Sequence, residues 1–128
     1  MYQLSERQKY LCKEIVDACY RVHKQLGPGL LEKVYEVCLC FELTKKGLLF
    51  ANQVDVPIFY DGIKLDKNLR LDVLVEQEII CEIKAVDIVN PIWEAQVLSH
   101  LRMSGKHVGF RINFNVAFIK DGIRYCRE

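Results

Sequence analysis

Asp72, Glu82 and Lys84 are the side chains whose types and spacing point most directly to chemistry. They lie in the segment 69–86, LRLDVLVEQEIICEIKAV, which has the pattern of two strands joined by a short polar turn. Both strands alternate apolar and polar residues, so side chains two positions apart share one face. The pattern predicts that two carboxylates and an ammonium group gather on one face of a sheet.

The register of this hairpin decides whether the carboxylates meet. If the turn is residues 76–78, counting outward places Asp72 opposite Glu82 and Arg70 opposite Lys84. Like charges directly opposite each other are destabilising, so either Arg70 and Lys84 or a bound divalent metal must compensate. Two carboxylates with few other ligands suit Mg²⁺ or Mn²⁺, which keep several waters and accept phosphate oxygens. For this spacing alone, a solvated salt-bridge cluster is the simpler interpretation.

Two helices are predicted before these strands. Ser5 and Gln8 form a capping-box pattern at the start of the first helix, which ends at Gly27. The second helix covers about 30–46, and its first turn carries Glu32, a position that the helix dipole favours for an acid. Glu32 would assist the strand carboxylates only if it faces them. The inward-facing residues of the second helix are predicted to be Leu30, Val34, Val37 or Cys38, and Phe41.

The remaining segments predict one more helix and further strands. Asn90 and Pro91 begin a helix that ends at about Ser104, and Gln96 and His100 share one of its faces. The predicted strands are 53–60, with a bulge or free edge at Pro57 and a hairpin turn at Asp61-Gly62, then 108–114, and a C-terminal hairpin of 116–120 and 123–127. The order indicates an α/β domain with a mixed sheet covered by helices.

Composition narrows the class of protein. The chain of 128 residues suffices for a single domain, 1–128, with its own core. Its net charge of +1 leaves no large basic surface of the kind that tight nucleic-acid binders carry. We find no secretory signal, and no apolar run approaches the roughly 20 residues of a membrane span. None of the six cysteines forms a C-x-x-C pair, so we expect reduced, mostly buried thiols in a cytoplasmic protein rather than a zinc site.

The segment from Gly29 to Tyr35, GLLEKVY, resembles the G-x-x-E-x-x-Y signature of the GxxExxY protein family. The Asp72, Glu82-Ile83-Lys84 and Gln96 segments look like the rest of that pattern, and the family is similar in turn to the PD-(D/E)XK nuclease superfamily. The resemblance covers most of the chain. It implies a restriction-endonuclease-like αβββαβ core, here with an extra N-terminal helix and a C-terminal hairpin.

The resemblance also implies roles for single residues. Asp72 and Glu82 correspond to metal ligands for Mg²⁺ or Mn²⁺, Glu32 to the helix carboxylate that assists them, and Lys84 to the catalytic lysine. Gln96 corresponds to a glutamine near the substrate. The tyrosine that often follows this glutamine is His100 here, and Trp93 stands where related sequences frequently carry histidine. The candidates for contact with substrate are Tyr35, Arg70 and His100.

Three hypotheses about function follow. The first is a metal-dependent nuclease that hydrolyses phosphodiester bonds of DNA or RNA. The alternative is a catalytically inactive protein of the nuclease fold that binds nucleic acid or a protein partner, which the near-neutral charge favours. A third hypothesis, a homo-oligomeric interaction module, depends on the apolar face of the first helix and on Trp93 and Phe110, residue patterns that more often belong to a core.

Overall fold

The computed structural model describes residues 2–128, whose helices and strands follow the predicted order. The elements are α1 (Glu6–Leu26), α2 (Glu32–Lys45), β1 (Phe50–Tyr60), β2 (Ile63–Val75), β3 (Ile79–Lys84), α3 (Ile92–Ser104), β4 (Val108–Asn113), the 3-10 turn η1 (Ile119–Asp121) and β5 (Ile123–Arg127). The strands form one five-stranded sheet in the order β1-β2-β3-β4-β5. Only β3 and β4 run parallel, so the predicted mixed sheet is confirmed.

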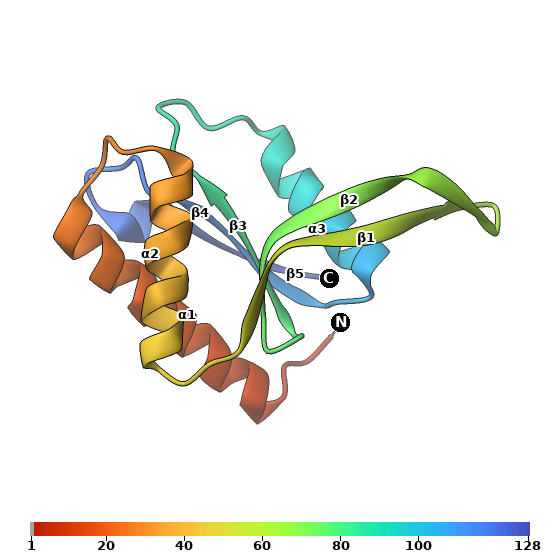
Figure 1. The fold of residues 1–128 in the computed structure, drawn as a ribbon, viewed down its shortest axis with the longest axis horizontal. Helices are drawn as coiled ribbons and strands as arrows, with labels where there is room; N and C mark the ends of the chain where they lie inside the picture. The colour runs from red at the N-terminus through yellow and green to blue at the C-terminus, as the bar shows by residue number, and fades with distance from the viewer. Residues whose placement is uncertain (1) are drawn as a thin grey trace.

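Helices cover both faces of the sheet, and strand alternation decides which side chains each helix meets. Ile79, Cys81 and Ile83 pack into the larger core beneath α1 and α2, while Ile80 packs with Val97 and other residues beneath α3. Figure 1 shows α1 and α2 on one side of the sheet and α3 on the other. Glu82 and Lys84 have the parity of Ile80, as predicted, and therefore belong to the α3 face.

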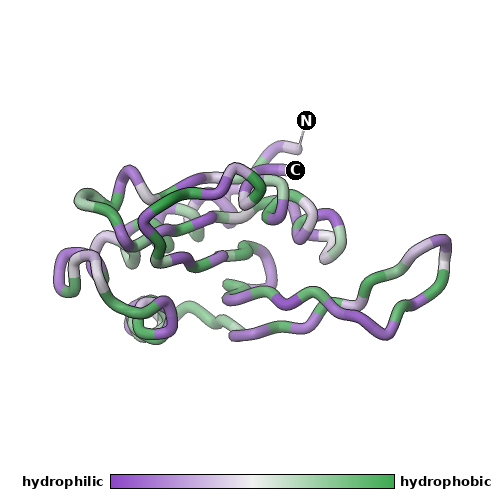
Figure 2. The backbone as a smooth tube through the Cα atoms, turned by 90° about the horizontal axis from the view of Figure 1, so that it is seen from above, coloured by the Kyte–Doolittle hydropathy of each residue, from purple (hydrophilic) through white to green (hydrophobic). Residues whose placement is uncertain are grey.

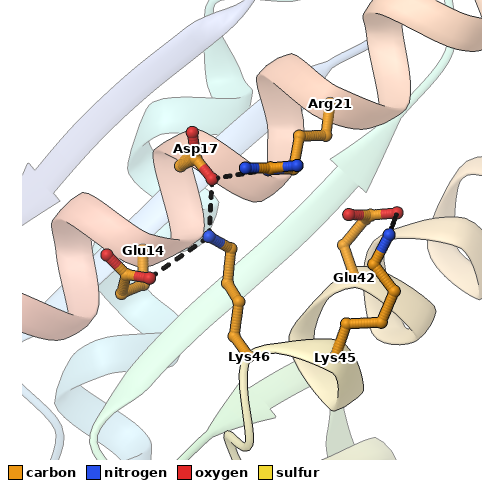
Figure 3. A network of polar contacts seen from close by, with 6 residues as sticks. All are labelled: Glu14, Asp17, Arg21, Glu42, Lys45 and Lys46. Carbon is orange, nitrogen blue, oxygen red and sulfur yellow. Dashed lines mark hydrogen bonds and ion pairs between the residues drawn. The ribbon is translucent and has the colours of Figure 1, made fainter.

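A clamp of charged residues ties α1 to the C-terminus of α2. Figure 3 shows Lys46 reaching across to α1, where its Nζ lies 3.2 Å from Glu14 Oε1 and 2.5 Å from Asp17 Oδ2. Arg21 Nε also donates to Asp17, at 2.8 Å. The hydrogen bond from Lys46, followed by that from Arg21, lowers the pKa of Asp17 to about 2. The clamp fixes the α1–α2 pair that carries Glu32.

The predicted inward face of α2 is wrong except at Cys38, which is partly buried and packs against the core. Val37 and Phe41 are 58% and 62% exposed, and Leu30 and Val34 are exposed as well. The buried stripe consists instead of Tyr35, Leu39 and Leu43. Apolar residues occur around most of this helix, so spacing did not identify the buried stripe. Tyr35 fixes the orientation because its ring stacks on Phe114 of the core, with centroids 4.7 Å apart.

Strands β1 and β2 continue beyond the other strands as a two-stranded arm (Figures 1 and 2). The predicted turn at Asp61-Gly62 is confirmed, with positive φ at both residues, and so is the irregularity at Pro57. By contrast, β2 pairs with β3 only from Val75↔Ile79 to Val73↔Cys81. The ladder therefore ends one residue before Asp72, where the two strands part.

The predicted pairing of Arg70 with Lys84 is wrong for the same reason. Arg70 lies on the arm, opposite Asp55 of β1, and its Nε donates to the Asp55 carboxylate at 3.3 Å. Both side chains are exposed. Arg70 thus neutralises an acid of the arm and does not offset the strand carboxylates.

The C-terminal segment differs in part from the prediction. Residues 116–120 form no strand, and Ile119–Asp121 adopt a 3-10 turn. β5 pairs antiparallel with β4 instead, which gives the C-terminal hairpin a longer connection than expected. The chain passes so close to β4 that a Cβ on Gly122 would lie 2.0 Å from the Asn113 carbonyl oxygen.

Several residues of the predicted oligomeric surface belong to the core. Leu11, Ile15 and Ala18 on the apolar face of α1 are fully buried, and Phe110 is nearly so. The six cysteines are free thiols, four of them buried. Within residues 2–128, we find no helix with both the length and the apolar character needed to cross a membrane.

Candidate active site

The two strand carboxylates lie where β2 separates from β3. Asp72 Oδ2 accepts a hydrogen bond from the Ile83 amide at 2.8 Å, so the carboxylate takes the place of a ladder partner. Burial, and then the charge of Glu82, raise the pKa of Asp72 to about 7, although the Ile83 amide opposes this rise. Asp72 and Glu82 are therefore close neighbours whose negative charges repel each other.

Glu82 is the more enclosed of the two acids, with 7% of its surface exposed. His100 on α3 donates from its Nδ1–H to the Glu82 Oε1 carboxylate oxygen at 2.9 Å. Among the described residues, no lysine or arginine forms an ion pair with Asp72 or Glu82. The histidine is thus the polar side chain that orients Glu82.

Lys84 lies at the end of β3, on the face of Glu82. Its Nζ is 5.1 Å from the centroid of the Trp93 ring on α3, which is a cation–π contact. The following backbone is fixed by buried Asn113, whose amide accepts from the Val86 N–H at 3.1 Å and donates to the Val86 carbonyl at 3.0 Å. Trp93 and Asn113 together restrict where the lysine can reach.

Glu32 is the first residue of α2 and is exposed. Partial loss of solvent around its carboxyl group raises the pKa of Glu32, the charge of Lys84 lowers it, and the charges of Glu36 and Glu82 raise it. The charge of Glu32 in turn raises the pKa of Asp72. Although α2 packs on the opposite face of the sheet from α3, its N-terminus brings Glu32 within electrostatic range of the strand carboxylates and Lys84.

Tyr35 does not lie on the substrate side, contrary to expectation. Its side chain is fully buried, its hydroxyl donates to the Gly27 carbonyl at 2.6 Å, and the Leu30 amide donates to its oxygen at 3.1 Å. These bonds fold the connection between α1 and α2 against the core. Tyr35 therefore fixes the start of α2, and with it Glu32, without facing the site.

Glu36 is a buried acid that sequence reasoning missed. It lies one turn after Glu32 and accepts hydrogen bonds from Asn52 Nδ2 at 3.0 Å and Gln53 Nε2 at 3.1 Å. Gln53 adopts a positive φ of 49°, which is uncommon for a residue other than glycine. These contacts join α2 to the root of the arm and hold the two elements that carry Glu32 and Asp72.

A small cleft between β3, β4 and α3 gathers the remaining candidates. Its lining residues are Glu82, Lys84, Trp93, Gln96, Val97, His100 and Arg111. Gln96 and His100 meet there as their shared helix face predicted. Arg111 was missed as a site residue, although it is the only charged residue in the apolar strand segment 108–114, VGFRINF. A larger groove between α1 and η1 lies apart from these acids.

The donor set fits a hard divalent ion with few protein ligands. Within residues 2–128, no group of three or more His, Cys, Asp or Glu side chains is close enough to hold a metal by itself. Two adjacent carboxylates that repel each other are present, and Mg²⁺ commonly binds through one or two carboxylates while it keeps several waters. Asp72 and Glu82 would hold such an ion, and Glu32 lies within electrostatic range of them.

Comparison with known proteins gives one match. The family model described as "PD-(D/E)XK nuclease superfamily" matches residues 9–126, which is nearly the whole chain. The three helices and the mixed five-stranded sheet are consistent with the restriction-endonuclease-like fold expected for that superfamily. Searches of curated proteins and of solved structures gave no match.

Proposed function

Because the chain belongs to the PD-(D/E)XK nuclease superfamily, we propose that it is a metal-dependent nuclease that hydrolyses phosphodiester bonds of nucleic acids. The observation that carries this proposal is the juxtaposition of Asp72 and Glu82 at the parting of β2 and β3. Burial, and then the charge of Glu82, raise the pKa of Asp72 to about 7, and no lysine or arginine in the described chain pairs with either acid. A divalent ion would relieve the repulsion between the two carboxylates.

Asp72 and Glu82 hold the ion in this proposal, and Glu32 supports it directly or through water. When bound, the ion would polarise the phosphoryl group and lower the pKa of an attacking water. The Ile83 amide and His100 keep the two carboxylates in place. Partial burial of these acids strengthens every electrostatic interaction in the site.

Lys84 stabilises the negative charge that develops on the phosphate in the transition state, or orients the attacking water. Its cation–π contact with Trp93 holds it beside the cleft that both residues line. Gln96 and His100 line the same cleft and would contact the substrate. His100 has a second function here, because it already donates to Glu82.

The non-catalytic alternative is favoured by that same hydrogen bond. His100 occupies one oxygen of Glu82 at 2.9 Å, and a protonated imidazole would partly replace a metal as the counter-charge. In that case the cleft binds nucleic acid or a protein without cleaving it. The affinity of the protein for a divalent metal distinguishes the two functions, because the non-catalytic function does not require a bound metal.

The proposal also covers the family, the metal ion, the substrate and the cellular compartment. The segment from Gly29 to Tyr35 supports membership in the GxxExxY family, and we propose Mg²⁺ or Mn²⁺ as the ion and DNA or RNA as the substrate. Six free cysteines support a reducing compartment such as the cytoplasm. Assembly into a homo-oligomer stays a prediction that sedimentation at several concentrations would test.

A cleavage panel tests the function. The purified protein is incubated with single- and double-stranded DNA and with RNA, in Mg²⁺, Mn²⁺ or EDTA. We expect cleavage in the presence of metal that Lys84→Ala abolishes and that Lys13→Ala, an exposed lysine on α1, leaves unchanged. Cleavage that persists in Lys84→Ala or in EDTA would contradict the proposed site.

A further inference from the structure

Three charged residues form a row across the sheet on the α3 face. Glu82 of β3 pairs in register with Arg111 of β4, and Arg111 pairs with Arg124 of β5. The neighbouring row confirms the face, because Ile80 and Cys126 pack with residues of α3 on either side of Gly109. Arg111 therefore lies between an acid and a second arginine.

The two outer residues of the row each form a hydrogen bond or ion pair with a side chain of α3, but the central residue does not. His100 donates to Glu82 at 2.9 Å, and Arg124 Nη2 lies 3.2 Å from Glu94 Oε2. Arg111 has no hydrogen bond or ion pair with any residue in the described chain, and its Nε is buried without a partner. Although Glu82 is next to it in the sheet, the two side chains form no ion pair.

An unsatisfied donor of a charged group is expensive to bury. A buried polar group without a partner costs about 1–3 kcal/mol, and more when it is charged. Two arginines directly opposite each other in neighbouring strands also repel. Arg111 is kept in this position without an ion pair to the neighbouring Glu82, which leaves its guanidinium group available to an anion from outside.

The cleft beside Arg111 has the lining that a phosphate would need. Lys84 supplies a second cation, Gln96 supplies an amide donor, and Trp93 provides an aromatic wall. The guanidinium group presents donors in a planar fork that matches two phosphate oxygens. Because this lining adjoins Glu82, an anion held there lies next to the proposed metal site.

We infer that Arg111 binds a non-bridging phosphate oxygen of the nucleic-acid backbone, at a phosphate in or beside the position that is cleaved. The inference rests on the proposed nuclease function and adds a substrate-binding residue to it. The shared chemistry is the phosphodiester, which DNA and RNA both present. Arg111 thus contributes affinity without reading the base sequence.

Binding measurements with defined probes test this inference. Fluorescence anisotropy is recorded with fluorescein-labelled 20-nucleotide DNA, as single strand and duplex, and with RNA of the same sequence, in Ca²⁺ and at several salt concentrations. The variants are Arg111→Leu and Arg111→Gln. The control is Arg21→Gln, which removes one positive charge from α1 on the opposite face of the sheet.

We expect both Arg111 variants to bind at least about tenfold more weakly at fixed salt. The slope of log affinity against log salt concentration should fall by about one, as for loss of one phosphate contact. Arg21→Gln should change neither quantity. If the Arg111 variants bind only DNA or only RNA more weakly, the result would still support the inference and would show which nucleic acid Arg111 contacts. The melting temperature of Arg111→Leu should equal or exceed that of the wild type, because the unsatisfied donor is gone.

Two results would overturn the inference and leave the nuclease function intact. One is wild-type affinity and salt slope in Arg111 variants that melt normally. The other is unfolding of both variants, which would identify Arg111 as a structural residue. Failure of the wild type itself to bind any probe or to cleave in the panel above would instead contradict the proposed function, so the two failures are distinguishable.

Discussion

Replacing Asp72 by asparagine should stabilise the metal-free protein while it removes metal binding. Asparagine has nearly the same shape, and its Oδ1 can still accept the Ile83 amide that now bonds to Asp72 Oδ2 at 2.8 Å. What disappears is a half-buried negative charge next to Glu82. Removal of that charge relieves both the cost of burial and the repulsion, which are the two largest causes of the raised pKa.

The raised pKa gives the magnitude and the sign. The pKa of Asp72 rises from its ordinary 3.8 to about 7, which corresponds to at most about 4 kcal/mol at 1.36 kcal/mol per unit. Solvent still reaches part of the carboxyl group, so we expect about 1–2 kcal/mol. Below about pH 4 the Asp72 carboxyl group is protonated in both the folded and the unfolded protein, so it does not lower the free energy of unfolding. Its destabilising effect grows as the pH rises toward 7 and is constant above it.

Urea unfolding in EDTA at pH 4 and pH 8 measures this difference. The free energy of unfolding of Asp72→Asn should equal that of the wild type at pH 4 and exceed it at pH 8. Saturating Mg²⁺ at pH 8 should reverse the order, because only the wild type gains the stability that ligand binding confers. A variant that is less stable than the wild type in EDTA at pH 8, or that gains equally from Mg²⁺, would refute the reasoning.

Three further predictions concern the elements that hold the site. Tyr35→Phe should lower the free energy of unfolding by about 1–3 kcal/mol in urea titrations, because it removes two part-buried hydrogen bonds, to the Gly27 carbonyl and from the Leu30 amide, whereas Tyr10→Phe on the exposed side of α1 should have little effect. Gly122→Ala should cost more than about 2 kcal/mol in the same assay, because its Cβ would lie 2.0 Å from a backbone oxygen; a change below 0.5 kcal/mol would contradict that close approach. Lys46→Ala should raise the pKa of Asp17 from about 2 toward its ordinary value in an NMR pH titration, and an unchanged value would show that Arg21 alone sets it.

The sequence predicted the element order and the faces of β3 because period-two alternation is a strong signal in a half-buried strand. It also located both ends of α1, where Ser5 and Gln8 form the expected capping box. It failed on the buried face of α2, where apolar residues occur on several sides. There the choice depends on the stacking of Tyr35 on Phe114, a contact between residues far apart in the chain.

The candidate site was likewise predicted only in part. The spacing of Asp72, Glu82 and Lys84 predicted a shared face, but not that β2 leaves β3 at Asp72 and carries Arg70 away on an arm. Where two strands part depends on the whole sheet and not on local alternation. Arg111 was missed because its significance comes from the lack of an ion pair with the adjacent Glu82, which only the packed structure reveals.

The position of a divalent ion tests the central claim most directly. Crystals soaked in millimolar Mn²⁺ should give an anomalous scattering peak between the carboxylates of Asp72 and Glu82, on the side that faces Glu32 and Lys84. Absence of a peak at that position, with the bond from His100 to Glu82 intact, would contradict the claim that these two acids form a metal centre.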